Sequence, residues 1–332
     1  MRKLYFLLPG TTRPFHCGGL WAELKTLRLA QQVCAAQIVT YRQREPDTLF
    51  LADLLRQPPE DVIFVASWGF DVAKLARKLR DRNLLYHAHS AGYGFRLPAA
   101  VPIMTVSRNT LGYWGQQAPH SLLYYLPNQI SEEFRDQGLK RDIDVLVHPR
   151  KSSQYLMEQL VPALKSRCRV QVIDGFVEDL AALFSRSHIY LYDSAEYWAM
   201  QGVTEGFGLQ PLEAMACGCQ VFSSINHGLS DYLDPGFNCH KIAGYSTPFD
   251  VQRILQVLKT ASPPPVSEAL FQEYRLENIL AKLEVILAEL NLFFDYKQQH
   301  PGDIDALTRS RLWRLRGQRL WQKLKQKIAN SP

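Results

Sequence analysis

The stretch "GVTEGFGLQPLEAMACGCQVF", residues 202–222, places two glutamates eight positions apart around a glycine-bearing turn. From Gly208 onward, leucine and alanine recur at helical spacing, which predicts a helix that begins just after the turn. The preceding run "HIYLYDS", residues 188–194, predicts a buried strand. The stretch therefore predicts a strand, a loop that carries Glu205, and a helix that carries Glu213 on its second turn.

This arrangement suits a ligand with a diphosphate and hydroxyl groups. The N-terminus of a helix offers unpaired backbone N–H groups and a partial positive charge, which favour a phosphate. Gly206 and Gly208 leave room for the diphosphate because they lack side chains. The carboxylate of Glu213 can accept two hydrogen bonds from a ribose diol, and Glu205 can meet the hydroxyls of a sugar. The simpler alternative is that both glutamates only stabilise the helix dipole.

The composition, with 332 residues, 46% hydrophobic and 21% charged, is that of a globular protein of about two domains. No run of about 18 apolar residues is present, and the apolar part of "MRKLYFLLPG" is too short for a signal peptide. We therefore expect no membrane span and no export. The net charge of +6 comes from the C-terminal end, where residues 303–332 hold eight basic residues and two aspartates.

The cysteines are scattered along the chain, which favours reduced thiols in a cytosol. They are Cys17, Cys34, Cys168, Cys217, Cys219 and Cys239. One alternative is a zinc site formed by "CGC", residues 217–219, together with "CH", residues 239–240. The C-x-C spacing is unusual for structural zinc, so we expect no metal site.

Short β-rich runs alternate with helical patterns, which is typical of βαβ units with parallel sheets. The first half predicts strands at 3–9, 36–41, 61–67, 84–90 and 101–107, with a helix at 71–82. The second half predicts strands at 142–148, 169–174, 188–194 and 219–224, with helices at 154–167 and 177–187. A charged segment at 126–142 separates the halves. A proline-rich stop at 262–267 precedes a predicted helix at 276–290.

The segment "EGFGLQPLEAMACGCQVF" resembles the signature of the GT-B glycosyltransferases of family 4, the glycosyl transferases group 1. The resemblance extends to five further segments: "PGTTRPFHCGG" at 9–19, "VSRNT" at 106–110, "LPNQI" at 126–130, "VLVHPRKSSQYL" at 145–156 and "FNCHKI" at 237–242. It covers residues 1 to about 295 and leaves the tail outside.

The resemblance implies an α/β GT-B fold, in which two doubly wound Rossmann-like domains face a cleft. The acceptor-side domain would span residues 1–130, and the domain that binds the nucleotide sugar would span residues 131–285. A helical extension at 286–332 would end in a basic amphipathic helix.

The resemblance also implies roles for the residues around the glycine turn. Glu213 would bind the ribose hydroxyls, and the backbone of Phe207, Gly208 and Leu209 would receive the diphosphate. Glu205 would bind the ring hydroxyls of the donor sugar.

Arg150 and Lys151 would neutralise the diphosphate as it leaves. The alternative is a solvated surface pair. Family members commonly hold these two cations several residues apart, so their adjacency here means that only one is expected to reach the phosphates. A second departure is His227 with Gly228, where many members have two glycines.

In "YHAHSAGYG", residues 86–94, two histidines two positions apart point the same way from a strand end. The family places a histidine across the cleft from the donor sugar, and His89 is the better candidate over His87. The alternative is a hydrogen-bonded core histidine. Gly18 and Gly19, in the first glycine-bearing loop, would open the acceptor side or would simply make a turn.

The implied function is retaining transfer of a hexosyl group from a nucleotide sugar to a hydroxyl of a glycan or lipid-linked acceptor, in cell-surface polysaccharide or glycolipid synthesis. The departing phosphate would help to deprotonate the acceptor, and no metal or other cofactor would be required. Two alternatives are a phosphorylase or epimerase on the same fold, and a non-catalytic membrane-bound scaffold.

The tail "RSRLWRLRGQRLWQKLKQKIANSP", residues 309–332, has an apolar helical stripe beside basic flanks. The stripe consists of Trp313, Leu320, Trp321, Leu324 and Ile328. Tryptophans beside a cationic face suit an anionic membrane surface, so we expect a cytoplasmic protein that is peripheral on the inner face of a membrane. Packing on the protein's own first domain is the alternative, and nucleic acid is a weaker one because phosphate binding needs no apolar stripe.

Overall fold

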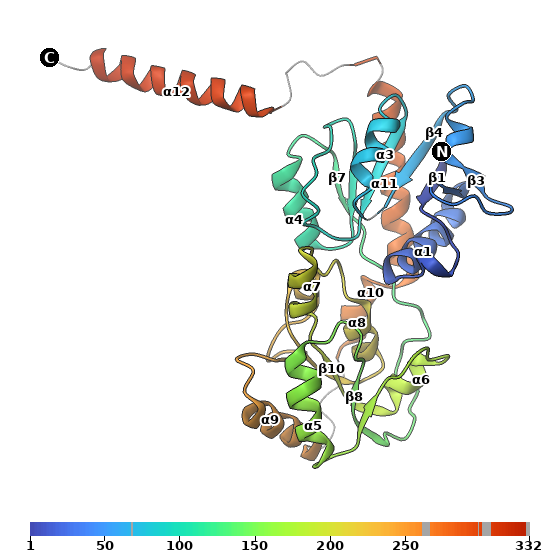
Figure 1. Cartoon of the computed structure of the whole chain (residues 1–332), viewed down its shortest axis with the longest axis vertical. Helices are drawn as coiled ribbons and strands as arrows, with labels where there is room; N and C mark the ends of the chain where they lie inside the picture. Colours follow the sequence, from blue (N-terminus) through green and yellow to red (C-terminus); the bar gives the residue numbers. More distant parts are fainter. Residues whose placement is uncertain (68, 261–265, 298, 301–306, 330–332) are drawn as a thin grey trace. The chain divides into compact units, whose positions relative to one another are not determined.

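Figure 1 shows the computed structural model of the chain, which describes residues 1–67, 69–260, 266–297, 299–300 and 307–329. The chain divides into two compact units, Met1–Asn291 and a second unit that begins at Leu292. None of the helices in the described ranges is long and apolar enough to cross a membrane.

The first unit begins with a seven-stranded parallel sheet in the order β3-β2-β1-β4-β5-β6-β7. Its strands are β1 Lys3–Leu8, β2 Ala36–Thr40, β3 Leu49–Phe50, β4 Val62–Ala66, β5 Asn83–Ala88, β6 Ile103–Thr105 and β7 Leu123–Tyr125. Its helices are α1 Gly18–Val33, α2 Leu51–Leu54, α3 Val72–Lys78 and α4 Arg108–Gln117, with a short 3-10 turn at Arg13–Phe15. The strands are almost continuously apolar because helices cover both faces of a parallel sheet.

A second parallel sheet follows in the order β12-β11-β10-β8-β9. Its strands are β8 Ile143–Val147, β9 Val170–Val172, β10 Ser187–Tyr192, β11 Gln220–Ser223 and β12 His240–Lys241. Its helices are a π-turn at Leu156–Leu160, α5 Val161–Lys165, α6 Leu180–Ser185, α7 Ala195–Gln201, α8 Leu209–Ala216, α9 Thr247–Lys259 and α10 Glu268–Gln272, with a 3-10 turn η3 at His227–Asp231. Helix α11, Leu276–Lys297, comes last, and its Asn291 side chain accepts a hydrogen bond from the backbone N–H of Arg2 at 2.9 Å.

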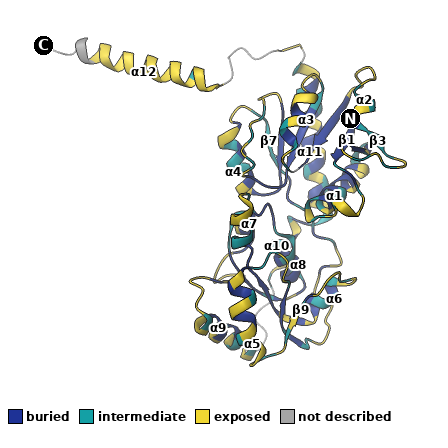
Figure 2. Cartoon of the chain, in the orientation of Figure 1, coloured by how far each residue is buried: buried dark blue, intermediate teal, exposed yellow. Residues whose placement is uncertain are grey.

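Strand β10 shows how the second sheet separates two cores. Tyr190 and Tyr192 point into the core that contains α6 and α8, while Ile189 and Leu191 point into the core that contains α5 and α9. This alternation follows from the two-residue period of a strand. Figure 2 shows the central strands of both sheets as mostly buried. Helix α8 therefore lies against one face of the sheet, with its first residue near the carboxyl ends of the strands.

The structure confirms the α/β class and the two parallel sheets, and each strand predicted from the sequence is present. The short strands β3, β7 and β12 were not predicted. Helices α3 and α6 are shorter than the predicted 71–82 and 177–187. The predicted proline stop lies largely outside the described residues, which omit 261–265.

One prediction was wrong in local structure. Gly18 and Gly19 were expected in a loop, but they form the first turn of α1. An added Cβ at Gly18 would meet nothing within 4 Å, so no close approach requires glycine there.

The second unit contains α12, Arg309–Ala329. Nearly all of its described side chains are exposed, including Trp313 and Trp321 at 72% and 61% (Figure 2). The side chains of Lys327 and Ile328, and residues 330–332, lie outside the described part of the chain.

Candidate active site

The start of α8 presents backbone N–H groups that have no hydrogen-bond partner among the described residues. Gly208 caps the helix in the left-handed region, with φ of 76°, and an added Cβ would overlap the Leu229 side chain. The Tyr232 hydroxyl donates to the carbonyl oxygens of Phe207 and Gly208. Within the described residues, no hydrogen bond is recorded from the N–H groups of Phe207, Gly208 or Leu209. Three donors therefore stand together at a helix N-terminus, an arrangement that favours an anion.

Glu205 lies in the loop before α8 and is buried, with 4% of its surface exposed. Its Oε2 accepts hydrogen bonds from the Tyr192 hydroxyl and from Trp198 Nε1, both at 2.6 Å. Its Oε1 lies 3.8 Å from Lys151 Nζ, and this ammonium sits 4.4 Å from the centre of the Trp198 ring. One carboxylate oxygen is thus held by the protein, while the other faces a cation.

Lys151 and Arg150 behave differently at the turn after β8. Lys151 has φ of 68° and reaches Glu205. The Arg150 side chain is exposed, and its backbone N–H donates to Nδ1 of His148 at 3.0 Å. The structure therefore brings Lys151 to the loop that carries Glu205 and leaves Arg150 in solvent.

Glu213 lies on the second turn of α8 and is 8% exposed. Burial raises its pKa to about 7, with Lys25 acting in the opposite direction and Glu133 adding to the rise. Lys25, from α1, donates to the carbonyl of Gln129 at 2.9 Å and to Ser131 Oγ at 2.8 Å. Burial lowers the pKa of Lys25, and the charge of Glu213 opposes this shift most strongly. No local sequence pattern marks Lys25, whose charge acts on Glu213 only in the folded chain.

The loop at the end of β5 contacts the Glu205 loop directly. The N–H of Thr204 donates to the Ala91 carbonyl at 3.1 Å, and the N–H of Ala91 donates to Thr204 Oγ1 at 2.9 Å. An added Cβ at Gly206 would overlap the carbonyl oxygen of His89. Glycine at 206 is therefore required by the close approach of the two loops, and the approach places His89 near Glu205.

His227 and Gly228, the departure noted in the sequence, pack on the same loop. The N–H of Glu205 donates to His227 Nδ1 at 3.3 Å, and the N–H of Gly228 donates to the Glu205 carbonyl at 3.0 Å. An added Cβ at Gly228 would overlap the backbone of Gly206. His227 and Gly228 therefore hold the loop that carries Glu205 in place through backbone contacts.

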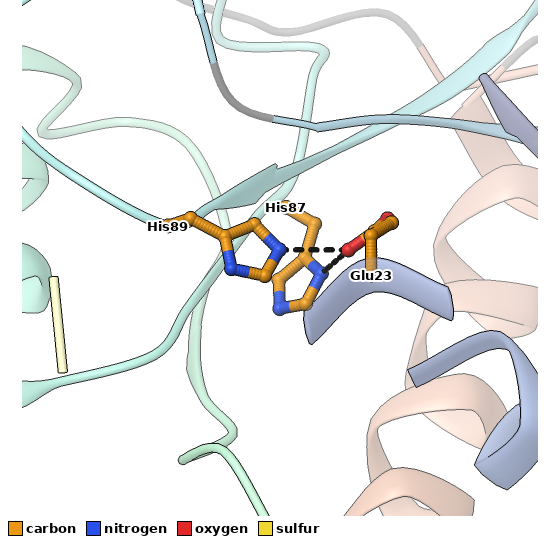
Figure 3. Close-up of side chains that lie close together, drawn as sticks. All are labelled: Glu23, His87 and His89. Atoms are coloured by element: carbon orange, nitrogen blue, oxygen red, sulfur yellow. Dashed lines mark hydrogen bonds and ion pairs between the residues drawn. The ribbon is translucent and has the colours of Figure 1, made fainter. Parts of the chain in front are cut away.

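The two histidines of "YHAHS" do point the same way, and both meet a residue that sequence reasoning missed. Glu23 of α1 is fully buried, and its Oε2 lies 2.6 Å from His87 Nδ1 and 2.7 Å from His89 Nε2 (Figure 3). Its Oε1 accepts a hydrogen bond from Ser67 Oγ at 2.5 Å. Although burial acts to raise the pKa of the Glu23 carboxyl, the two imidazoles hold it well below its usual range. Burial and the nearby His87 lower the pKa of His89.

The zinc alternative is not supported by the side-chain positions. In the described part of the chain, Glu23, His87 and His89 form the group whose potential ligand atoms lie within 4.8 Å of one another, and the pairs at 217–219 and 239–240 form none. Cys219 Sγ instead faces the Phe184 carbonyl at 3.1 Å.

The two doubly wound parallel sheets, with the start of α8 between two glutamates, are the arrangement of the GT-B fold. Residues 133–259 match the model of the family described as "Glycosyl transferases group 1". This part of the chain is a glycosyl transferases group 1 domain, and the protein is an enzyme of the glycosyltransferase class. None of the curated proteins compared with the chain matches it.

Three solved structures illustrate the shared fold. The glycosyltransferase from Rickettsia africae ESF-5 is 12% identical with a TM-score of 0.65, over 87% of this chain and 98% of that one. HepE from Anabaena, in complex with UDP-glucose, is 15% identical with a TM-score of 0.65, over 87% and 100%. Sucrose-phosphate synthase from Thermosynechococcus elongatus is 13% identical with a TM-score of 0.59, over 88% and 100%. At these identities the similarity establishes the fold.

Proposed function

We propose that the protein transfers a sugar from a nucleotide-diphosphate sugar to a hydroxyl of a glycan or glycolipid, with retention of anomeric configuration. The observation that carries this proposal is the start of α8. Three N–H groups that have no acceptor among the described residues lie there between Glu205 and Glu213, inside a group 1 domain. In this proposal the N–H groups bind the diphosphate, Glu213 binds the ribose, and Glu205 lies near the sugar.

Each charged residue has a distinct role in this proposal. The Glu213 carboxylate accepts hydrogen bonds from the ribose diol, and ligand binding favours its ionised form. Lys151 stabilises negative charge on the departing diphosphate, together with the positive end of α8. Arg150 is the second cation and adds a weaker, solvent-screened positive charge near the phosphates. Glu205 offers its Oε1 to a donor hydroxyl, because Oε2 is already held.

The chemistry requires no metal or other cofactor in this proposal. Lys151, Arg150 and the helix N-terminus supply positive charge where the phosphate leaves, and the departing phosphate takes the proton of the acceptor hydroxyl. His89 lies across from the donor sugar. Gly18 and Gly19, on the first turn of α1, face the acceptor side.

We also propose that α12 binds an anionic membrane and brings a cytoplasmic enzyme to a lipid-linked or membrane-proximal acceptor of cell-surface polysaccharide or glycolipid synthesis. Residues 309–329 contain eight basic residues and no acidic one. The apolar residues Leu320, Trp321 and Leu324 are exposed. Aromatic and leucine side chains enter the headgroup region, and each Lys or Arg near an anionic surface adds about 1 kcal/mol.

A thermal-shift panel of UDP-, GDP- and ADP-sugars tests the donor site. A ligand that binds only the folded state at 100 times its Kd stabilises it by about 2.7 kcal/mol, which raises the Tm measurably. UDP-glucose is the first compound to test, because HepE was solved with it. We expect one nucleotide series to raise the Tm, and a flat response across the panel would contradict the proposal.

A further inference from the structure

A buried hydrogen-bond network centred on Glu23 ties together three elements of the first sheet. Glu23 comes from α1, Ser67 follows β4, and the two histidines come from the end of β5. Figure 3 shows both imidazole rings turned toward the same carboxylate oxygen. One side chain thus fixes the position of the β5 end relative to its neighbours.

The chemistry of the carboxylate also determines where the histidine protons lie. An ionised carboxylate only accepts hydrogen bonds, so His87 carries its proton on Nδ1 and His89 carries its proton on Nε2. Because burial holds the pKa of His89 down, its ring is neutral near pH 7 and its Nδ1 is an acceptor. Glu23 therefore selects one tautomer of His89.

Hydrogen bonding explains these distances better than a shared metal does. Two ligands on one zinc ion, each at about 2.0–2.1 Å, lie about 3.3 Å apart in tetrahedral geometry. The observed separations are 2.6 and 2.7 Å.

One buried polar atom of the network is left unsatisfied within the described residues. His87 Nε2 is buried and has no hydrogen-bond partner in the described residues. A buried polar network that is only partly satisfied is less favourable than an apolar core. Such violations are expected at functional sites.

Few contacts separate Glu23 from the loop that carries Glu205. His89 bonds to Glu23 through its ring, and its carbonyl oxygen lies against Gly206. Two residues later, Ala91 exchanges hydrogen bonds with Thr204, which precedes Glu205. A shift of the β5 end would therefore displace Glu205.

We propose that Glu23 is a positioning residue for glycosyl transfer, which sets the tautomer of His89 and holds the β5 end so that Glu205 meets the donor sugar. This inference rests on the proposed function. It concerns a residue on α1 that touches neither the nucleotide nor the sugar.

The test is Glu23→Gln, compared with Glu60→Gln. The glutamine keeps the shape but removes the negative charge and leaves one oxygen acceptor, so the hydrogen bonds to the two imidazoles are no longer charge-assisted. Glu60, an exposed residue that precedes β4, accepts a hydrogen bond from Tyr5 and provides the same substitution at the amino end of a strand, away from the β5 end. With the nucleotide sugar that gives the largest thermal shift, we expect Glu23→Gln to lower kcat at least tenfold while nucleotide Kd stays within twofold. Glu60→Gln should match the wild type.

Long-range ¹H–¹⁵N NMR of histidine-labelled protein supplies a readout that does not depend on activity. The wild type should show Nδ1–H on His87 and Nε2–H on His89, and Glu23→Gln should change at least one. Ser67→Ala, which removes one donor and keeps the charge, should lower kcat about threefold with unchanged Kd. It keeps the test valid if Glu23→Gln does not fold.

The outcomes separate the two proposals. Other tautomers in the wild type, or an unchanged kcat in Glu23→Gln or in Ser67→Ala, would overturn the role of Glu23 alone. A wild type that turns over no nucleotide sugar would overturn the proposed function, while the tautomers would still report on the network.

Discussion

Glu213 is a buried carboxyl group whose pKa lies near neutral pH. Burial raises this pKa to about 7, so in the unligated protein the group is half protonated there. A ribose diol donates its hydrogen bonds to the ionised form, which means that binding must first deprotonate the group below pH 7. The affinity of the donor site is therefore coupled to pH through one residue.

We predict that UDP-glucose, or the sugar nucleotide that the thermal-shift panel selects, binds about tenfold more weakly at pH 6 than at pH 8. The sign follows because the fraction of ionised Glu213 rises through its pKa. Glu213→Gln should remove most of this dependence and weaken binding at pH 8 by about 1–3 kcal/mol. Calorimetric titration at both pH values measures this, and equal affinities in the wild type would contradict the role of Glu213.

Lys151 and Arg150 should contribute unequally to turnover. Lys151 already lies beside Glu205, whereas the Arg150 side chain is in solvent. Because charge on the leaving phosphate peaks in the transition state, Lys151→Ala should lower kcat about 10²-fold with a smaller effect on Kd. Arg150→Ala should lower kcat less than tenfold. Steady-state kinetics, together with a measured donor Kd, would test this difference in kcat. Wild-type turnover in Lys151→Ala would show that Lys151 has no role in the chemical step.

The element that the site depends on most is α8, whose capping residue Gly208 has a left-handed backbone conformation that favours glycine. Gly208→Ala would combine a left-handed φ with overlap on Leu229, so we predict a loss of about 1–3 kcal/mol in unfolding free energy. Gly18→Ala is the matched control, because Gly18 starts α1 with open space around it. It should change stability by less than about 1 kcal/mol. Urea unfolding of both variants compares them, and equal effects would refute the steric account.

The strands and α8 could be predicted because their signals are local. The run before Asp193 and the helical spacing after Gly208 each lie within a few residues of sequence. The strands β3 and β12 have two residues each, which is too short for a period to show. Gly18 and Gly19 suggested a turn, but the helical pattern of α1 continues through them.

The contacts of the candidate site were harder to predict than its motif. Glu205 and Glu213 stand out because they flank a glycine turn. Glu23 and Lys25 sit on an ordinary helix, and their partners are 66 and 104 residues away. Such contacts form only in the folded chain, and no single stretch of sequence records them.

At the scale of the whole molecule, α12 makes a separate prediction. Full-length protein should co-sediment with vesicles that contain anionic lipid, and deletion of residues 303–332 should abolish this while nucleotide binding remains. Trp313→Ser with Trp321→Ser should weaken sedimentation although every charge is kept, because the interfacial anchors are lost. Neutral vesicles serve as the control. Sedimentation that survives the deletion, or a truncated protein that does not fold, would contradict membrane binding by α12 and favour a structural role for this helix.

The most direct test of the account is to follow the sugar itself. Purified protein is incubated with the sugar nucleotide that raises its Tm most, and NMR records both the phosphorus signals and the anomer of the first sugar released to water. We predict release of the nucleoside diphosphate and a sugar with the anomeric configuration of the donor, with both strongly slowed in Lys151→Ala. A released sugar of inverted configuration would contradict retaining glycosyl transfer.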